Sequence, residues 1–304
     1  MKRDLLSIRD LSRVEILELI SRAETIKREI AAGNPRRSLS GRIVGLIFVK
    51  PSTRTRVSFE AAVYRLGGQA MFMTAQDTQI SRHEPLADMA RVLDRYIDAI
   101  VIRTFGHQDV EELASYASVP VINALTDRFH PCQVLADLLT IKEKRSLDKL
   151  TVAWVGDGNN VAHSWINASA RLGFRLNLAC PPGFQPDEEV LSWAAVQRQS
   201  AIRVTPDPVE AVSGADVIYT DVWASMGQES DADRRRKAFR NYQVNADLLA
   251  AAPRDALVLH CLPAHRGEEI TDDVLEGPQS VVFDQAENRL HVQAALLDWL
   301  IGDA

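Results

Sequence analysis

The chain has 304 residues, of which 46% are hydrophobic and 25% charged, and this length and balance favour a globular protein of about two domains. The formal net charge of −6 gives no reason to expect nucleic acid or an anionic membrane as a partner. Three cysteines far apart in the chain, no apolar signal core and no apolar run long enough to span a bilayer predict a cytoplasmic protein without a disulfide framework.

Short apolar, β-branched runs alternate with helical patterns through the first half of the chain. Strands are expected at Ile43–Val49, Ala70–Met73, Ala99–Ile102 and Val119–Asn123. Helices are expected at Val57–Leu66, Glu84–Tyr96, Asp109–Ala117 and, as the connection to the second half, His130–Arg145. Such strand–helix alternation predicts a parallel sheet that is covered on both faces.

The same alternation continues through the second half. Strands are expected at Thr151–Val155, Arg175–Ala179, Ile202–Val204, Asp216–Tyr219, Leu257–Leu259 and Val281–Phe283. Helices are expected at Asn160–Leu172, Asp187–Gln199, Asp207–Val212 and Glu287–Ile301. The predicted fold is therefore α/β, with two doubly wound parallel-sheet domains over residues 1–145 and 146–286, and with the C-terminal helix (residues 287–304) packing back onto the first domain.

Polar clusters follow predicted strands at six places. They are Ser52–Thr55, Arg103, His130, Gly156–Asn160, Asp221–Gly227 and His260–Ala264. In open parallel sheets, ligands bind beyond the carboxyl ends of the strands. Because the clusters come from both halves, the sequence predicts one active site in the cleft between the two domains.

Lys50–Arg56 reads Lys-Pro-Ser-Thr-Arg-Thr-Arg and leads from a predicted strand into a helix. Free backbone N–H groups, hydroxyls and a guanidinium at a helix N-terminus suit a phosphate or a similar dianion. The glycine-rich ATP loop is missing, so a small anion is expected. Arg54 and Arg56 point to roughly opposite sides of a helix, and Arg54 is the one we expect to face the anion. The alternative is a capped helix with exposed arginines.

Two further clusters lie in the first half. Arg103 ends a predicted strand, where its planar fork would suit a phosphate or a carbonyl oxygen; the alternative is a surface arginine. His130 opens a helix together with Pro131, where it could donate to a carbonyl oxygen while Gln133 holds an amide. A core or capping histidine is the alternative.

In the second half, Gly156–Asn160 resembles a dinucleotide-binding loop, but Val161 occupies the place of the third glycine. A tight turn in which Asn160 offers its amide to a ligand is favoured. Asp221 could pair with a substrate ammonium, and it begins a long polar stretch, to about Asn241, that suggests a lid. Within this stretch the basic run Arg234–Lys237 is expected to be a solvated loop.

His260–His265 reads His-Cys-Leu-Pro-Ala-His. A metal site is disfavoured because adjacent His and Cys side chains diverge and no second pair stands at a zinc spacing. Cys261 as a covalent nucleophile lacks an obvious base. The favoured reading is a strand-end turn that offers backbone carbonyls and one thiol to a substrate amine.

Taken together, four segments resemble the motifs of the aspartate/ornithine carbamoyltransferase family, in its order and spacing. They are Ser52–Arg56, His130–Gln133, Asp221 with Ser225–Gly227, and His260–Ala264. The last two resemble the ornithine branch. The resemblance covers essentially the whole chain. It implies transfer of a carbamoyl group from carbamoyl phosphate to the side-chain amine of L-ornithine, giving L-citrulline and phosphate in arginine biosynthesis, with no metal or cofactor.

The resemblance also implies roles for individual residues. Those expected to bind carbamoyl phosphate are Ser52, Thr53, Arg54, Thr55, Gln79, Arg103, His130, Gln133, Cys261, Leu262 and Arg289. Those expected to bind ornithine are Leu125, Asn160, Asp221, Ser225 and Met226. The catalytic residues among these are Arg54, Thr55, Arg103, His130 and Cys261. Gln79 would come from a neighbouring subunit of a homotrimer.

Three other acceptors are compatible with these motifs, namely aspartate, acetylornithine and putrescine. The Asp221 and Ser225–Gly227 pattern favours free ornithine among them. A catalytically silent family member that only binds an anion or a protein partner is the alternative outside enzymes. Intact Arg54, Arg103, His130 and Cys261 argue against it.

Overall fold

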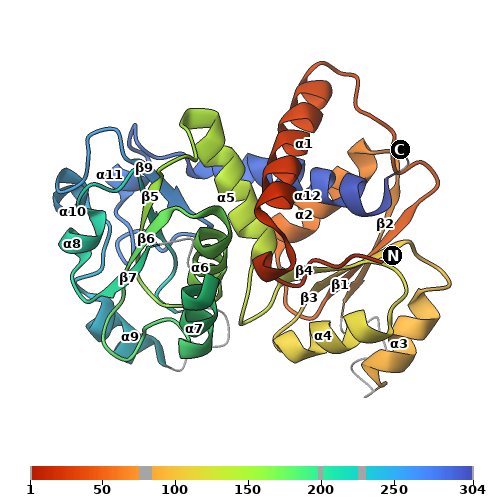
Figure 1. The fold of residues 1–304 in the computed structure, drawn as a ribbon, viewed down its shortest axis with the longest axis horizontal. Coiled ribbons are helices and arrows are strands. Elements are labelled where there is room, and N and C mark those ends of the chain that lie inside the picture. The colour runs from red at the N-terminus through yellow and green to blue at the C-terminus, as the bar shows by residue number, and fades with distance from the viewer. Residues whose placement is uncertain (1, 75–83, 198–200, 225–230, 303–304) are drawn as a thin grey trace. The chain divides into compact units, whose positions relative to one another are not determined.

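The computed structural model describes residues 2–74, 84–197, 201–224 and 231–302 of the chain (Figure 1). The chain divides into two compact units, the first made of Met1–Leu139 with Glu287–Ala304 and the second of Thr140–Ala286. Each unit contains one parallel sheet. The expected α/β class with two parallel-sheet domains is thereby confirmed.

The first unit holds a four-stranded sheet in the order β2-β1-β3-β4. Its elements in chain order are the 3-10 turn η1 (Ile8–Asp10), α1 (Arg13–Ala31), β1 (Ile43–Phe48), α2 (Thr53–Arg65), β2 (Gln69–Thr74), α3 (Leu86–Leu93), β3 (Ala99–Arg103), α4 (His107–Tyr116), β4 (Val121–Leu125), α5 (Pro131–Lys144) and α12 (Val282–Ile301), the last two running into the second unit. Figure 1 shows α3 and α4 on one face of this sheet, and α1, α2 and α12 on the other.

Local sequence explains why these elements form. The residues Ile-Val-Gly-Leu-Ile-Phe of β1 are apolar and almost all buried, as expected for a strand covered on both faces. Ser12 caps α1 through a capping box with Glu15. Ser52 caps α2, where its Oγ accepts from the Thr55 N–H at 3.3 Å. This cap sets the start of α2 four residues earlier than the apolar periodicity indicates.

The second unit holds a five-stranded sheet in the order β7-β6-β5-β8-β9. Its elements are β5 (Thr151–Val155), α6 (Asn160–Leu172), β6 (Arg175–Ala179), α7 (Glu188–Gln197), β7 (Ile202–Thr205), α8 (Pro208–Val212), β8 (Val217–Thr220), α9 (Ala232–Phe239), α10 (Ala246–Ala250), β9 (Leu257–His260) and α11 (Asp272–Leu275). In Figure 1, α6 and α7 lie on one side of this sheet, and α8, α10 and α11 on the other. Its core includes Val155, Ile218 and Phe239.

Two expectations about the second unit are wrong. Val281–Phe283 is not a strand, because extended pairing ends where the Val281 N–H donates to Val258 O, and α12 begins at Val282. A short apolar run does not by itself distinguish a strand from a buried helix start. The polar stretch after Asp221 is not wholly irregular either, since it contains α9.

None of the described helices is both long enough and apolar enough to cross a membrane.

Candidate functional site

The turn after β1 leads into α2, whose first residues include two exposed arginines, Arg54 and Arg56. Arg56 is already engaged, because its guanidinium pairs with Glu60 at 3.0 Å and lies 3.6 Å from the ring centroid of Phe72. Arg54, in the first turn of α2, is exposed and forms no ion pair with a residue that the structure describes. Arg54 and the first N–H groups of α2 thus lie together at the helix N-terminus, a place where anions are stabilised.

Lys50, just before this turn, is buried, and sequence reasoning gave it no role. Its ammonium pairs with Asp127 and lies 4.0 Å from the ring centroid of Phe105. These contacts join the turn after β1 to the loops that follow β3 and β4 in the same sheet. The signal in the sequence is a lysine that directly follows an apolar strand and begins the motif.

Arg289, on α12, links α2 to α5 within the first unit. Its Nη2 donates to Thr55 Oγ1 at 3.1 Å and its Nη1 donates to Gln133 Oε1. Gln133 in turn donates to Asp137 Oδ1 at 2.8 Å. Arg289, Thr55 and Gln133 are all buried. The Arg289 guanidinium is therefore held in a fixed orientation and shielded from water.

His130 and Arg103 are buried near the same guanidinium. Burial lowers the pKa of His130 well below its usual value, and the positive charges of Arg289 and Arg103 lower it further. The imidazole is therefore neutral at pH 7, while the two arginines carry the positive charge. A group of five buried residues of the first unit, which we call the anion cluster, thus lies together: Thr55, Arg103, His130, Gln133 and Arg289.

The remaining residues assigned to the first unit are less informative. Leu125 ends β4 and is half-buried. Thr53 is exposed in the first turn of α2. Gln79 lies outside the described residues.

Asp221 is the centre of a second polar group, in the second unit. Asn159 Nδ2 donates to Asp221 Oδ2 at 2.7 Å, and Asn159 Oδ1 caps α6 by accepting from the N–H groups of Val161 and Ala162. Asn160 is the first residue of α6. Sequence reasoning selected Asn160 and missed Asn159, although Asn is a preferred N-cap residue before such a helix.

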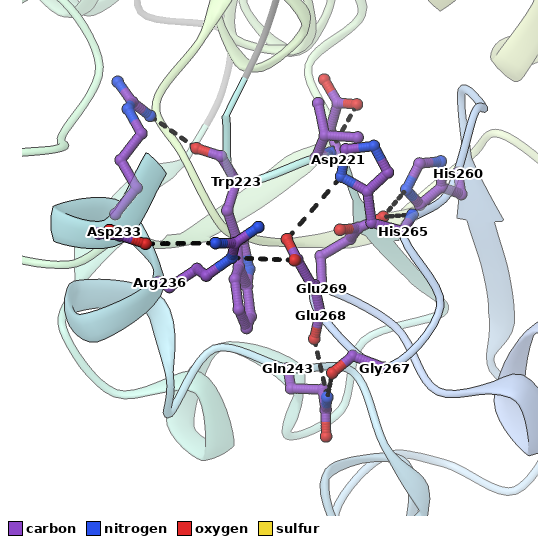
Figure 2. A network of polar contacts seen from close by, with 12 residues as sticks. Asp221, Trp223, Asp233, Arg236, Gln243, His260, His265, Gly267, Glu268 and Glu269 are labelled. Carbon is purple, nitrogen blue, oxygen red and sulfur yellow. Dashed lines mark hydrogen bonds and ion pairs between the residues drawn. The ribbon is translucent and has the colours of Figure 1, made fainter. Parts of the chain in front are cut away.

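The thiol of Cys261 meets Asp221. Sγ donates to Asp221 Oδ1 at 2.9 Å. The turn that carries Cys261 is held by its neighbours, since the Leu262 N–H donates to His260 Nδ1 at 2.8 Å, and His260 Nε2 lies 3.0 Å from Glu269 (Figure 2). The polar residues that follow β8 and β9 thus bring the Asp221 carboxylate and the Cys261 thiol together.

Metal binding fits this group poorly. Asp221, His260 and Cys261 bring ligand atoms within 4.8 Å of one another, as do His265, Glu268 and Glu269. However, both ring nitrogens of His260 are already in hydrogen bonds, and Glu269 Oε1 already accepts from the His265 N–H at 2.6 Å. A metal would have to displace the contacts that hold the turn.

The basic run Arg234–Lys237 is not a solvated loop, because it lies in α9 and one of its arginines is buried. Nη1 of Arg235 donates to Asp157 Oδ2 and to Trp223 O, both at 2.7 Å. Burial raises the pKa of Asp157, and the Arg235 charge opposes this rise. Arg235 thus joins α9 to the turn before α6 and to the segment that follows Asp221. Ser225 and Met226 themselves lie outside the described residues.

Arg236, the next residue of α9, is exposed and points to other partners. It pairs with Glu268 at 3.0 Å and with Asp233 at 3.3 Å (Figure 2). Gln243 Nε2 donates to the carbonyl oxygens of Gly267 and Glu268. These contacts attach the α9 region to the loop that carries Glu269.

Comparisons with known proteins identify a family model for each half of the chain. Residues 3–143 match the family model described as aspartate/ornithine carbamoyltransferase, carbamoyl-P binding domain, and residues 148–300 match the Asp/Orn binding domain. An ornithine carbamoyltransferase of Desulfotalea psychrophila is 57% identical over 303 residues, covering 99% of this chain and 100% of that protein. An anabolic ornithine carbamoyltransferase of Pyrococcus furiosus is 54% identical, covering 99% of this chain and 96% of the relative.

Solved structures give the same result. An ornithine carbamoyltransferase from Pyrococcus furiosus superposes with a TM-score of 0.95 at 53% identity, covering 98% of this chain and 97% of the other. The anabolic ornithine carbamoyltransferase of Campylobacter jejuni has a TM-score of 0.93 at 40% identity and covers 99% of each chain.

Proposed function

Because this chain belongs to the aspartate/ornithine carbamoyltransferase family, we propose that it transfers the carbamoyl group of carbamoyl phosphate to the side-chain amine of L-ornithine. The products are L-citrulline and phosphate. Relatives and solved structures named anabolic support a role in arginine biosynthesis. The reaction needs no metal or cofactor, since positioning and electrostatics suffice for an activated acyl phosphate.

The anion cluster of the first unit carries the proposal. Arg289 is fixed by Thr55 and Gln133, and lies near the buried Arg103 and the neutral His130. Carbamoyl phosphate is a dianion with a carbonyl oxygen, so it needs both cations and preorganised donors. Arg54, Ser52, Thr53 and the first N–H groups of α2 would hold the phosphate. Gln133 would hold the carbamoyl amide.

The chemical step follows from these donors. Attack on the carbamoyl carbon forms a C–N bond and places negative charge on the carbonyl oxygen. Thr55, Arg103 and His130 would stabilise this oxyanion. Collapse breaks the bond to the phosphate oxygen, and the phosphate leaves with its charge held by Arg54 and the N-terminus of α2, while it takes up the proton that the amine nitrogen loses.

The Asp221 group would bind ornithine. The carboxylate pairs with the α-ammonium, with help from Asn160, Leu125, Ser225 and Met226. The attacking amine must lose a proton, since an alkylamine has a pKa of about 10.4 in water. Nearby cations and exclusion of water favour the neutral amine. Cys261 and the carbonyl of Leu262 would meet the amine where the two substrates join.

The assembly and location are part of the same proposal. A homotrimer, in which a neighbouring subunit contributes Gln79 to each site, follows from the family resemblance. Three cysteines without a disulfide fit a reducing compartment such as the cytoplasm.

A carbamoyl-transfer assay tests the proposal. Carbamoyl phosphate is supplied with ornithine, acetylornithine, putrescine or aspartate in parallel reactions. Citrulline formed from ornithine, with the other amines far slower, is the expected result. Preference for another amine would contradict the assignment of Asp221. Carbamoyl phosphate binding by the folded protein, without transfer to any amine, would support a silent binding protein instead.

A further inference from the structure

His107, which begins α4, contacts the loop that leads to His130. Its Nδ1 lies 3.1 Å from Thr126 Oγ1, and its ring meets the Phe129 ring edge-on with centroids 4.9 Å apart. The His107 side chain is largely buried, although it belongs to no motif of the proposed site. Its position links the loop after β3 to the loop after β4.

The two loops need such a link because the strands before them do not pair regularly to their ends. The register between β3 and β4 shifts after Ile102, so that Arg103 pairs with Leu125. Beyond this point, two backbone bonds continue the contact. Thr104 N donates to Leu125 O at 3.1 Å, and Asp127 N donates to Phe105 O at 3.0 Å. Two side chains add further connections between the loops, namely Lys50, which contacts Phe105 and Asp127, and His107.

Thr126 and Phe129 close a tight turn directly before His130. The Thr126 N–H donates to Phe129 O at 2.9 Å, and the Phe129 N–H donates to Thr126 Oγ1 at 3.2 Å. Thr126 Oγ1 lies 3.1 Å from His107 Nδ1 and 3.5 Å from Phe129 O, so Nδ1 is the closer acceptor for the hydroxyl hydrogen. In this arrangement Nδ1 accepts, so the hydrogen-bond network assigns the proton of the neutral ring to Nε2.

The surroundings favour this neutral form. Burial lowers the pKa of His107, the charge of Glu111 raises it, and the charges of Arg128 and Arg9 lower it again. Glu111 lies on α4 itself, 3.7 Å from Nε2. A protonated ring could not accept from Thr126.

We infer that His107 is a positioning residue. In its neutral form it accepts from Thr126 and supports Phe129, and it thereby fixes His130 relative to Arg103. It has no contact with substrate in this role. Its kinetic consequence rests on the proposed function, because His130 and Arg103 are the groups assigned to the carbamoyl oxygen.

Two substitutions separate this role from simple packing. His107→Phe keeps a ring against Phe129 and removes the acceptor. His107→Asn places a carbonyl oxygen near the position of Nδ1 and keeps the acceptor. We expect His107→Phe to lower kcat/KM for carbamoyl phosphate about tenfold, the effect of about 1.4 kcal/mol, with the KM for ornithine unchanged. His107→Asn should retain most of the activity. Gln108→Ala, at the exposed next position, is the matched control.

Amide hydrogen exchange provides a readout that does not depend on catalysis. The segment 126–130 should exchange faster in His107→Phe than in the wild type or in His107→Asn. If His107→Phe does not fold, His107→Leu removes the acceptor and keeps an apolar side chain against Phe129. His107→Leu should then show the faster exchange and the lower kcat/KM, and His107→Asn should not.

The outcomes separate the two proposals. A wild type that transfers no carbamoyl group, while His107→Phe loosens segment 126–130, contradicts the proposed function and leaves the positioning role intact. An active wild type with unchanged exchange and unchanged kcat/KM in the acceptor-less variants overturns the positioning role. Loss of stability alone, with a wild-type kinetic profile, also overturns it, because His107 would then only support packing.

Discussion

Asp221 and Cys261 are separated by 40 residues in the chain, yet the Cys261 thiol lies 2.9 Å from Asp221 Oδ1. The sheet explains this proximity. β8 and β9 are neighbouring parallel strands in which Thr220 pairs with His260, so the residues that follow them emerge side by side. A substrate ammonium that pairs with Asp221 therefore comes close to the only one of the three cysteines that is not buried.

Asp221→Asn tests this arrangement. Asparagine keeps the size and one acceptor oxygen but removes the charge that would pair with the α-ammonium of ornithine. We expect the KM for ornithine to rise at least about tenfold, with carbamoyl phosphate binding unchanged, as measured by initial rates and by calorimetric titration with carbamoyl phosphate. The exposed Asp247 gives the control Asp247→Asn. An unchanged KM for ornithine in Asp221→Asn would contradict the assignment of Asp221 to the ornithine site.

Arg54→Ala tests the phosphate end of the site. Arg54 is exposed at the start of α2, so its loss should leave the fold intact, whereas the leaving phosphate loses a charge-assisted partner. We expect kcat/KM for carbamoyl phosphate to fall about 100-fold, with an unchanged circular dichroism spectrum. Arg65→Ala, at an exposed position in the last turn of the same helix, should keep wild-type kinetics. Full activity in a folded Arg54→Ala protein would refute the role given to Arg54.

Local patterns predicted much of the fold because the type of each helix or strand depends largely on residues that are neighbours in the sequence. The strands Thr151–Val155 and Arg175–Ala179 and the helix Asn160–Leu172 have the predicted bounds. The strand expected at Val281–Phe283 was wrong because a local pattern of three apolar residues fits either a strand or the start of a buried helix. Caps move boundaries too, as Ser52 does for α2.

The parts of the site that sequence reasoning missed depend on contacts between distant segments. The run Arg234–Lys237 looks uniformly solvated, and only the fold shows that Arg235 turns inward to Asp157. Similarly, no local pattern shows that Asn159 contacts Asp221. Buried partners of this kind are set by tertiary packing and leave little trace in composition or periodicity.

The buried His130 should make folding stability depend on pH. Its folded pKa lies well below the ordinary value of 6.5, chiefly because of burial, so below about pH 6.5 the unfolded chain binds a proton that the folded chain does not. The contribution of His130 to the free energy of unfolding should therefore be constant above about pH 6.5. Below that pH, the free energy of unfolding should fall by at most about 1.4 kcal/mol per pH unit. Urea unfolding between about pH 5 and 8 should show a shallower acid decline in His130→Gln. The exposed His265 supplies the control His265→Gln, and equal slopes in wild type and His130→Gln would contradict the prediction.

Arg235 should be the most important residue of the basic run for stability. It neutralises the buried Asp157 and also donates to Trp223 O, so Arg235→Ala leaves a buried carboxylate without its cation. We expect a loss of about 3–5 kcal/mol in the free energy of unfolding, measured by urea titration. Arg234→Ala, one residue earlier on α9 and largely exposed, should change stability by less than about 0.5 kcal/mol.

A double-mutant cycle shows whether the Asp157 charge is the cause. Once Asp157→Asn has removed that charge, Arg235→Ala should cost much less than it does in the wild type, because no carboxylate is left uncompensated. If both backgrounds lose the same free energy, the stabilisation comes instead from the bond to Trp223 O and from packing of the Arg235 side chain near the ring of Phe184, whose centroid is 4.9 Å from the guanidinium carbon. In that case α9 is held to the segment after Asp221 chiefly by neutral contacts, and its attachment should vary little with pH.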